Sequence, residues 1–249
     1  MKTISVYKDL AWTEPILAPP DENIDHTDLL CKLIKEHSQI KTKTLLHFGC
    51  GAGIMDYIFK RHFDVTGVDI SKNMLKVAQK INPEVTYIKG DMRKIKLNNV
   101  FDAVTIPDSI GYMTTEGDLK KVFQTICRHL KPGGLLLIVA HISEEFKENN
   151  FVYTGSKGDI EITLFENNYI PDSALNTYEA TMVYLIRQKR QLEIYTDCHT
   201  IGLFGLKTWL SLFKESKLQV IQMQDEHFYI PYIMGEGEYP LKIFICTRL

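Results

Sequence analysis

Residues 45–53 read LLHFGCGAG, and the chain runs on to VTGVD at residues 65–69. The apolar opening predicts a buried strand, and the three glycines predict a tight turn at its carboxyl end. Apolar residues at helical spacing over Ile54–Phe59 predict a helix, and a second strand then ends on Asp69. This order of strand, glycine turn, helix, strand and acid is typical of the first half of a nucleotide-binding βαβ unit.

Each part of this unit has a physical role in holding a ligand. Glycine lets a ligand approach the backbone closely, because no Cβ stands in the way. The helix that follows presents free N–H groups and a partial positive charge, which favour a carboxylate or a phosphate. The carboxylate of Asp69 can accept two hydroxyl protons from a ribose. We therefore expect a nucleotide-type ligand at this edge of the sheet.

The spacing of the glycines separates two classes of nucleotide site. A dinucleotide site requires G-x-G-x-x-G/A, and the sixth position counted from Gly49 is the bulky Ile54, which disfavours an NAD-linked oxidoreductase. The observed G-x-G-x-G resembles motif I of the Rossmann-like (class I) methyltransferases, which bind S-adenosylmethionine (AdoMet). That motif usually opens with Asp or Glu, whereas this chain has His47 there.

The composition is that of a globular protein with a sizeable core. The chain has 249 residues, of which 45% are hydrophobic and 24% charged, and its formal net charge is −2. This length suits one large α/β domain with an insertion. The balanced charge gives no electrostatic footprint for nucleic acid. We therefore expect a small-molecule partner, no nucleic acid, and a monomer or homodimer.

The cysteines and the hydropathy bear on compartment and metals. Five cysteines are scattered without C-x-x-C or Cys/His spacing, so we expect free thiols in a reducing compartment and no metal site. Residues 1–10 are too polar for a signal peptide, and no run of about 18 apolar residues predicts a membrane span. These features favour a cytoplasmic enzyme without membrane contact.

The later strands complete the predicted sheet. Strands are expected at Val85–Ile88, Phe101–Ile106 and Leu135–Ala140, with closing strands at Val220–Met223 and Lys242–Cys246. The continuous apolar run at 135–140 is typical of a strand that is buried on both faces. We therefore predict an α/β fold with a Rossmann-like, doubly wound, mostly parallel seven-stranded sheet.

Two polar segments follow predicted strands at the edge where such sheets bind ligands. Residues 90–93 read GDMR after the third strand, and residues 107–113 read PDSIGYM after the fourth. Ligands of open α/β sheets lie beyond the carboxyl ends of the strands. There Asp91 can accept a hydrogen bond from an adenine amino group, and Met92 can cover the face of the ring.

An inserted antiparallel β segment is predicted after the fifth strand. Segments rich in β-branched and aromatic residues alternate with turn residues there. The expected strands are Phe151–Tyr153, Ile160–Phe165, Tyr178–Ile186 and Leu192–Thr200, and the expected separators are Gly155, Gly158, Asn167–Asn168 and Gln188–Lys189.

These elements give one expected domain in three parts. The core comprises residues 24–142 and 205–249, and residues 146–204 form an antiparallel cap over the pocket. Residues 1–22 form an N-terminal flap, which we expect to be irregular because Pro15, Pro19 and Pro20 break helices.

Taken together, the chain resembles the AdoMet-dependent sugar N-methyltransferases, which dimethylate the amino group of nucleotide-linked deoxysugars, and more broadly their small-molecule methyltransferase relatives. The resemblance covers roughly residues 25–220. The segments that carry it are LLHFGCGAG, VTGVDISKNML, GDMRKIKLNNVFDAVTIPDSIGYM, LKPGGLLLIV and HTIGLFGLKTWLSLFKESKL.

The resemblance implies AdoMet as cofactor and indicates which residues hold it. The glycines would line the methionine end, Asp69 would hold the ribose hydroxyls, and Pro107 would offer its carbonyl near the sulfonium. An N-terminal tyrosine, here Tyr7, would close over the cofactor. The implied cofactor-binding residues are Tyr7, Phe48, Gly49, Gly51, Gly53, Asp69, Ile70, Asp91, Met92, Pro107 and Asp108.

The implied reaction is methylation of a small molecule, with an amine as the favoured acceptor. Tyr112 is the first candidate for orienting the nucleophile, and His141 is a candidate base because imidazole titrates near neutral pH. His199 is a more distant candidate, and Asp108 can instead bind a substrate ammonium. The sugar enzymes commonly carry His where this chain has Tyr112, so the acceptor itself does not follow from the resemblance.

Two other readings of the same motifs stay open. One is an O- or carboxyl-methyltransferase that acts on a small acid or hydroxyl acceptor with the same cofactor. The other is a non-catalytic protein that binds or senses AdoMet.

Overall fold

The computed structural model describes residues 2–3, 6–22, 24–225 and 229–249. Its larger sheet has seven strands, and all of them run parallel except β12, which is antiparallel to both of its neighbours. The order across the sheet is β11 (Leu218–Asp225), β12 (Leu241–Arg248), β6 (Leu130–Ala140), β5 (Phe101–Ile106), β2 (Thr44–Phe48), β3 (Asp64–Asp69) and β4 (Thr86–Lys89). This confirms the predicted seven-stranded α/β sheet.

Helices cover both faces of this sheet, as its apolar strands require. On one face α6 (Glu116–His129) and α7 (Leu206–Glu215) contribute Phe123, Trp209 and Phe213 to the core. On the other face α3 (Ile24–His37) and α4 (Asp56–Phe59) contribute buried residues such as Leu30, Ile34 and Phe59. The doubly wound arrangement therefore leaves only the ends of the strands open to a ligand.

The helix α5 (Lys72–Ile81) begins directly after the acid that ends β3. The side chain of Ser71 accepts a hydrogen bond from the Met74 N–H, which caps the helix as the sequence predicts. The helix packs against β3 and β4 at the edge of the sheet. This fixes the loop that carries Asp69 and Ile70.

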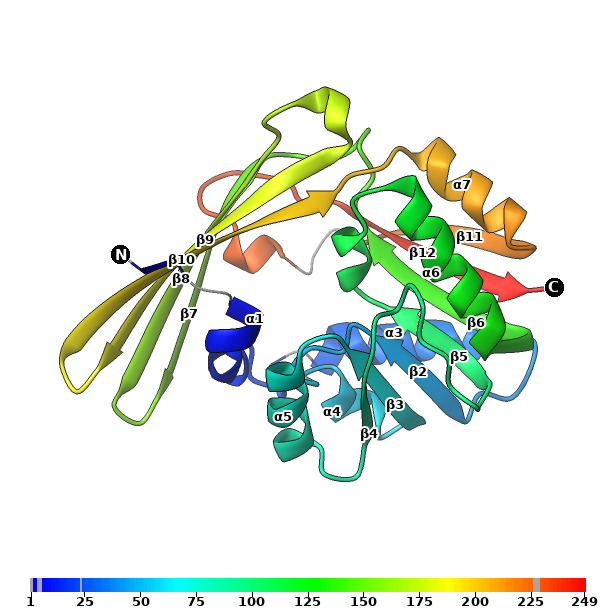
Figure 1. Ribbon diagram of the computed structural model, residues 1–249, viewed down its shortest axis with the longest axis horizontal. Coiled ribbons are helices and arrows are strands. Elements are labelled where there is room, and N and C mark those ends of the chain that lie inside the picture. Colours follow the sequence, from blue (N-terminus) through cyan, green and yellow to red (C-terminus); the bar gives the residue numbers. More distant parts are fainter. Residues whose placement is uncertain (1, 4–5, 23, 226–228) are drawn as a thin grey trace.

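A second, antiparallel sheet follows β6, and it confirms the predicted inserted segment. Figure 1 shows it standing beside the larger sheet, on the side that faces α5. Its order is β1 (Lys2–Thr3), β10 (Gln191–Gly202), β9 (Thr177–Gln188), β8 (Ile160–Tyr169) and β7 (Asn149–Lys157), with β1 parallel to β10. Hairpin turns with positive φ lie at Gly158 and at Lys189–Arg190.

Two of the expected separators were wrong, because they lie inside strands. Gly155 is within β7, where a Cβ would stand 2.0 Å from the Ile16 carbonyl oxygen. This glycine therefore permits a close backbone approach and does not mark a turn. Asn168 is within β8, where its buried amide donates to the Tyr239 hydroxyl. The link from β8 to β9 lies at residues 170–176 and contains the short helix η3 (Ser173–Leu175).

The expectation of an irregular N-terminal segment was also wrong within the described residues. This segment contains the short helices α1 (Val6–Asp9), η1 (Ala11–Thr13) and α2 (Glu14–Leu17). Pro15 stands in the first turn of α2, where its missing N–H costs no hydrogen bond.

The N-terminal helices connect the two sheets. Figure 1 shows α1 between the antiparallel sheet and α5. Val6, Leu10 and Ile16 pack against inward-facing residues of the antiparallel sheet such as Ile162 and Tyr184. The chain that precedes α3 is thus held over the ends of the core strands.

Across the ranges that the structure describes, none of the helices combines the length and the apolar character needed to span a bilayer.

Candidate active site

The glycine turn after β2 has the backbone conformation that the sequence predicts. Gly49, Gly51 and Gly53 all have positive φ, between 52° and 71°. A Cβ on Gly49 would stand 1.8 Å from the hydroxyl oxygen of Ser109, so no other residue fits there. A Cβ on Gly51, in contrast, would meet no atom within 4 Å. The turn therefore presents an open backbone cradle at Gly51.

Asp69 faces this cradle from the end of β3. Its Oδ2 accepts the Gly51 N–H at 2.9 Å, and its Oδ1 accepts the Ser71 N–H at 2.7 Å. Each carboxylate oxygen has a second lone pair for a hydroxyl donor. The acid is thus fixed at the rim of the sheet, in the position expected for a group that binds a ribose.

A cavity of about 430 Å³, which we call the cofactor cavity after the ligand that the sequence predicts, opens over these groups. Its size falls in the range typical of sites for small molecules and cofactors. The predicted cofactor-binding residues that line it are Tyr7, Gly49, Gly51, Asp69, Ile70, Asp91, Met92 and Asp108. They come from the N-terminal segment and from the carboxyl ends of four core strands, which the fold brings to one edge.

Three other predicted residues do not line this cavity. The Phe48 side chain is fully buried in the core, and its carbonyl accepts a hydrogen bond from Ser109. Gly53 lies under the turn, where a Cβ would stand 2.5 Å from the Tyr87 hydroxyl. Pro107 is the first residue after β5, and its neighbours Asp108 and Ser109 are the residues of this loop that line the cavity.

Asp91 is held by a neighbour that the sequence does not single out. The Arg93 side chain donates to both carboxylate oxygens of Asp91 and also bonds to Asp118 at 3.0 Å. The hydrogen bonds from Arg93 are the main reason why the pKa of Asp91 lies below its usual value. Asp91 is therefore a fixed anion in the lining of the cavity.

The residues present fit an adenosine-type cofactor. The open cradle at Gly51 leaves room for the ligand, and Asp69 keeps lone pairs for ribose hydroxyls. Ile70 is 64% exposed although it is large and apolar, so it offers an uncovered surface for the adenine ring. Met92 lies in the same cavity and can cover the ring.

His47, which stands where motif I usually has an acid, belongs to a buried network. Its Nδ1 lies 2.7 Å from Asp56 Oδ1, and the Tyr87 hydroxyl donates to Asp56 Oδ2 at 2.9 Å. Asn82 links Tyr87 to the carbonyl of Gly53. His47 therefore supports the glycine turn from below and does not line the cofactor cavity.

A second cavity of about 270 Å³ lies between the core and the antiparallel sheet. Tyr7, Glu14, Asp108 and Tyr112 line both cavities, so the two meet at these side chains. We call the second one the acceptor cavity. It is lined by eight tyrosines: Tyr7, Tyr112, Tyr153, Tyr178, Tyr184, Tyr229, Tyr232 and Tyr239.

Three carboxyl groups face the acceptor cavity. Loss of contact with bulk water is the largest cause that raises the pKa of each, to about 6 for Asp108 and to about 7 for Glu14 and Glu166. Asp108 is itself exposed toward the cavity, and the protein that surrounds the cavity is what raises its pKa. Among the described residues, no salt bridge involves any of the three.

A chain of hydrogen bonds joins the N-terminal segment, the β5 loop and the antiparallel sheet. The hydroxyls of Tyr7 and Tyr112 are 2.5 Å apart, and Tyr112 Oη lies 2.8 Å from His199 Nδ1. His199 Nε2 lies 3.0 Å from Asp197 Oδ2, which also accepts the Val6 N–H at 2.8 Å. Tyr112, the first catalytic candidate, therefore has an imidazole as its direct neighbour.

His141, the candidate base from the sequence, lines the acceptor cavity among aromatic rings. Its ring centroid lies 4.3 Å from that of Tyr239 and 5.2 Å from that of Phe146. Burial is the main cause that lowers its pKa to about 4, and its Nδ1 lies 3.3 Å from the Pro240 carbonyl oxygen. An imidazole with this pKa holds a proton weakly at neutral pH, which makes it a poor proton acceptor.

Sequence reasoning missed Glu14, Glu166 and Asp197 and ranked His199 low. Glu166 and Asp197 lie on the inward faces of β8 and β10, at even spacing from buried Leu164 and Ile201. An acid on the apolar side of an alternating strand is the signal that could have identified both. Glu14 carried no such signal, because its segment was expected to be irregular.

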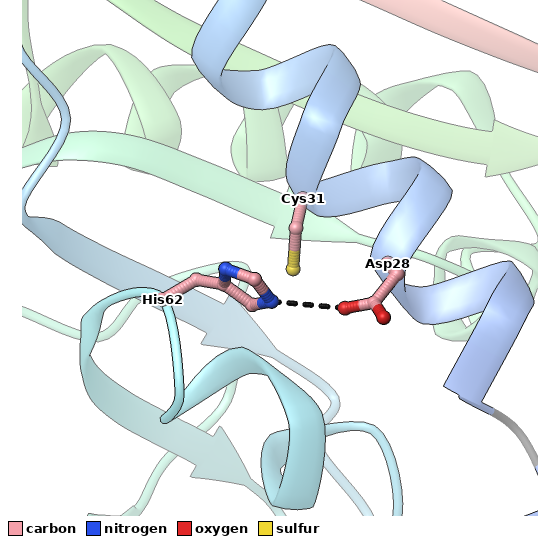
Figure 2. Close-up of side chains that lie close together, drawn as sticks. All are labelled: Asp28, Cys31 and His62. Atoms are coloured by element: carbon pink, nitrogen blue, oxygen red, sulfur yellow. Dashed lines mark hydrogen bonds and ion pairs between the residues drawn. The ribbon is translucent and has the colours of Figure 1, made fainter.

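One group of residues away from these cavities has metal-binding chemistry. Figure 2 shows Asp28 and Cys31 of α3 beside His62. One ligand atom of each of these residues lies within 4.8 Å of the others. His62 Nε2 lies 2.9 Å from Asp28 Oδ1, while its Nδ1 lies 2.8 Å from the ammonium of Lys35. Burial is the main cause that raises the pKa of Cys31 to about 12. A protonated thiol and an adjacent cation disfavour a metal ion.

Comparison with known proteins identifies the family to which the chain belongs. Residues 45–134 match a family described as a methyltransferase domain. The chain is 36% identical over 186 residues to the "Putative methyltransferase YqeM" of Bacillus subtilis (strain 168), with 71% of this chain and 73% of the relative covered.

Two further comparisons agree with this match. One relative is a dTDP-4-amino-2,3,4,6-tetradeoxy-D-glucose N,N-dimethyltransferase of Saccharopolyspora spinosa, 34% identical over 169 residues and covered to 66% in both chains. Among solved structures, Streptomyces venezuelae DesVI has the same fold, with a TM-score of 0.79, 20% identity and 94% of each chain covered. The chain therefore belongs to the Rossmann-like, AdoMet-dependent methyltransferase family.

Proposed function

We propose that this protein methylates the nitrogen of a small-molecule amine. The observation that carries the proposal is the junction of the two cavities, where the uncompensated carboxyls of Glu14 and Asp108 lie beside the hydroxyl of Tyr112. A carboxylate without a protein cation favours a positively charged ligand. Relatives that include an N,N-dimethyltransferase of an amino sugar support the same acceptor class.

The proposed cofactor residues hold the donor at the edge of the core sheet. When bound, AdoMet supplies a methyl group on a sulfonium, and the amine forms the C–N bond while the sulfur keeps the electrons of the broken S–C bond. Asp69 holds the ribose hydroxyls, Ile70 and Met92 enclose the adenine, and the glycine turn accommodates the methionine end. Since the donor is intrinsically reactive, alignment and exclusion of water are the main contributions of the protein, and orientation can provide about 7–11 kcal/mol.

In this proposal the acceptor amine lies at Asp108. An ammonium pairs with the carboxylate there, and tyrosine rings around the cavity add cation–π attraction. The amine must lose a proton before or as it attacks. The lining that the two cavities share contains two hydroxyls, those of Tyr7 and Tyr112, and they are hydrogen-bonded to each other.

Tyr112 and His199 are the proposed route for this proton. Burial is the main cause that raises the pKa of Tyr112, so its side chain stays a neutral hydroxyl that passes on a proton and does not act as a phenolate. His199 Nδ1 accepts from Tyr112, and Asp197 holds the other ring nitrogen, which stabilises the imidazolium that forms. His141 contributes to the aromatic lining in this account.

We propose that residues 24–142 and 205–249 form the core and that residues 146–204 form a cap over the acceptor. Residues 1–22 form a flap that completes the site. We further propose a cytoplasmic protein that acts as a monomer or homodimer and has no nucleic-acid partner. The five cysteines without a disulfide and the net charge of −2 support this setting.

The acceptor class is tested with methyl-labelled AdoMet and matched acceptors. Primary amines, alcohols and carboxylic acids on the same carbon chains are incubated with the protein, and the products are analysed by mass spectrometry. We expect labelled methyl groups on nitrogen. Transfer to oxygen would identify an O- or carboxyl-methyltransferase, and tight AdoMet binding without transfer to any acceptor would identify a sensing protein.

A further inference from the structure

The acceptor cavity contains a third carboxyl group that the transfer step does not need. Glu14 and Asp108 line both cavities and therefore lie where donor and acceptor meet. Glu166, on β8, lines the acceptor cavity but not the cofactor cavity. The acceptor cavity thus has two acids where it meets the cofactor cavity, and a third acid, Glu166, in the part that the cofactor cavity does not share.

Glu166 is directed inward by the alternation of its strand. Ile162, Leu164 and Asn168 are buried on the same face of β8, whereas Glu161, on the opposite face, is exposed. Within the part of the chain that the structure describes, a hydrogen bond with Asn168 is what lowers the pKa of the Glu166 carboxyl, against the larger effect of burial. Removing a carboxyl from water without a paired cation is unfavourable, so packing alone does not explain the half-buried Glu166 at this position.

The rest of the lining suits a cation and opposes a phosphate. Among the described residues that line the cavity there is no lysine or arginine, while eight tyrosines offer ring faces and hydroxyls. Ring faces attract ammonium groups. The diphosphate of a nucleotide-linked sugar would instead face Glu14, Asp108 and Glu166 with no lysine or arginine among these residues to receive it.

The size of the cavity also favours a small acceptor over a nucleotide-linked one. Its volume of about 270 Å³ lies at the lower end of ligand cavities, which typically run from roughly 300 to 1,000 Å³. A short carbon chain with a polar group at each end matches this volume and the two separated acids better than a nucleotide does.

We propose that the acceptor is a small diamine that is not linked to a nucleotide, with one amino group at Asp108 and a second ammonium at Glu166. The inference rests on the proposed N-methylation at this site and specifies its substrate class. The nitrogen at Asp108 gives up its proton through Tyr112 and gains the methyl group. The ammonium at Glu166 keeps its protons and holds the chain in place.

The test compares the binding of diamines and of monoamines by the wild type and by two variants, both with a substitution in β8. The probes are the α,ω-diaminoalkanes from diaminoethane to diaminohexane, the n-alkylamines of equal length, and a dTDP-linked amino sugar. Calorimetry with the AdoMet-loaded protein gives their dissociation constants, and mass spectrometry gives methyl transfer. Glu166→Gln removes the second anion, and Glu161→Gln makes the same change on the exposed face of β8 as a control.

We expect the best diamine to bind about tenfold or more tighter than its monoamine, and Glu166→Gln to abolish that preference while Glu161→Gln keeps it. Methylation of the monoamine and of the diamine should persist in Glu161→Gln, which lines neither cavity. Equal binding of diamines and monoamines by the wild type, or a preference for the nucleotide-linked sugar, would overturn the inference and leave N-methylation intact. Absence of transfer to every amine would instead refute the proposed function.

Discussion

The hydroxyl of Tyr112 lies 2.8 Å from Nδ1 of His199, although 87 positions separate the two residues in the sequence. Tyr112 follows a core strand, and His199 lies on the antiparallel sheet. The contact therefore joins the two halves of the molecule at the place where the two cavities meet. It also connects to the N-terminal segment, because Asp197 holds both His199 and the Val6 N–H.

Removal of the Tyr112 hydroxyl should slow methyl transfer without releasing the cofactor. Tyr112→Phe keeps the ring in the lining but breaks the link to His199, and loss of a positioned proton acceptor costs roughly 10²–10⁴-fold in turnover. His199→Gln should reduce turnover similarly, and the double variant should be no slower than the worse single one. Rates come from initial velocities, and AdoMet affinity from calorimetry.

A matched control for this prediction is Tyr169→Phe, because Tyr169 lies at the exposed end of β8. Its turnover should equal that of the wild type. If Tyr112→Phe turned over as fast as this control, Tyr112 would have no part in the proton route.

Asp69→Ala should abolish tight binding of AdoMet. The variant removes the acceptor for ribose hydroxyls and also frees the N–H groups of Gly51 and Ser71. Since hydrogen bonds to a charged group are each worth about 1.5–3 kcal/mol, two of them correspond to at least about 10²-fold in the dissociation constant.

Calorimetry with AdoMet measures this effect directly. Asp64→Ala, at the exposed beginning of the same strand, is the control and should bind normally. An unchanged dissociation constant for Asp69→Ala would contradict the assignment of the ribose site.

Asp56→Ala should destabilise the fold itself. The substitution removes the hydrogen-bond partner of the buried His47 and of the partly buried Tyr87. Each stranded buried polar group costs about 1–3 kcal/mol, so the free energy of unfolding should fall by at least about 2 kcal/mol. Chemical denaturation measures it, and Asp56→Asn, which keeps the shape and one acceptor, should lose less. A fall as small as that of Asp64→Ala would show that the network does not support the glycine turn.

The free protein should become less stable as pH rises through the titration of the cavity acids. Burial raises the pKa values of Glu14, Asp108 and Glu166 to about 7, 6 and 7, from ordinary values near 4. The folded state then binds more protons than the unfolded state between about pH 4 and pH 7, so stability falls with rising pH in that window. Affinity for an ammonium ligand should rise over the same window, because the carboxylates ionise.

The contribution of Glu166 can be measured separately. Thermal unfolding of the wild type and of Glu166→Gln is compared at about pH 5 and about pH 8. The variant should gain stability relative to the wild type at the higher pH, since it no longer ionises inside the cavity. Glu161→Gln should show no such change. A difference between wild type and Glu166→Gln that does not vary with pH would refute this prediction.

The core and the glycine turn could be predicted from the sequence because local signals determine them. Each of these signals acts through neighbours in the sequence. They are the apolar run of β6, the N-cap Ser71 and the alternate glycines. The strand ends that line the first cavity follow from the parallel order, so Asp69, Ile70 and Asp91 could be assigned to one edge.

The acceptor side could not be predicted in the same way, because contacts between distant elements create it. Gly155 has the signal of a turn, yet it serves the approach of Ile16 to β7. Glu14 and Glu166 become a pair of acids around one cavity only when the N-terminal helices pack on the antiparallel sheet. Their burial, and thus their electrostatic role, is a property of the assembled fold.

Mass analysis of a diamine after incubation with methyl-labelled AdoMet tests the central claim most directly. The account predicts a labelled methyl group on one nitrogen of the diamine and little transfer by Tyr112→Phe. A protein that binds AdoMet tightly yet labels no amine, or places the label on oxygen, would contradict it.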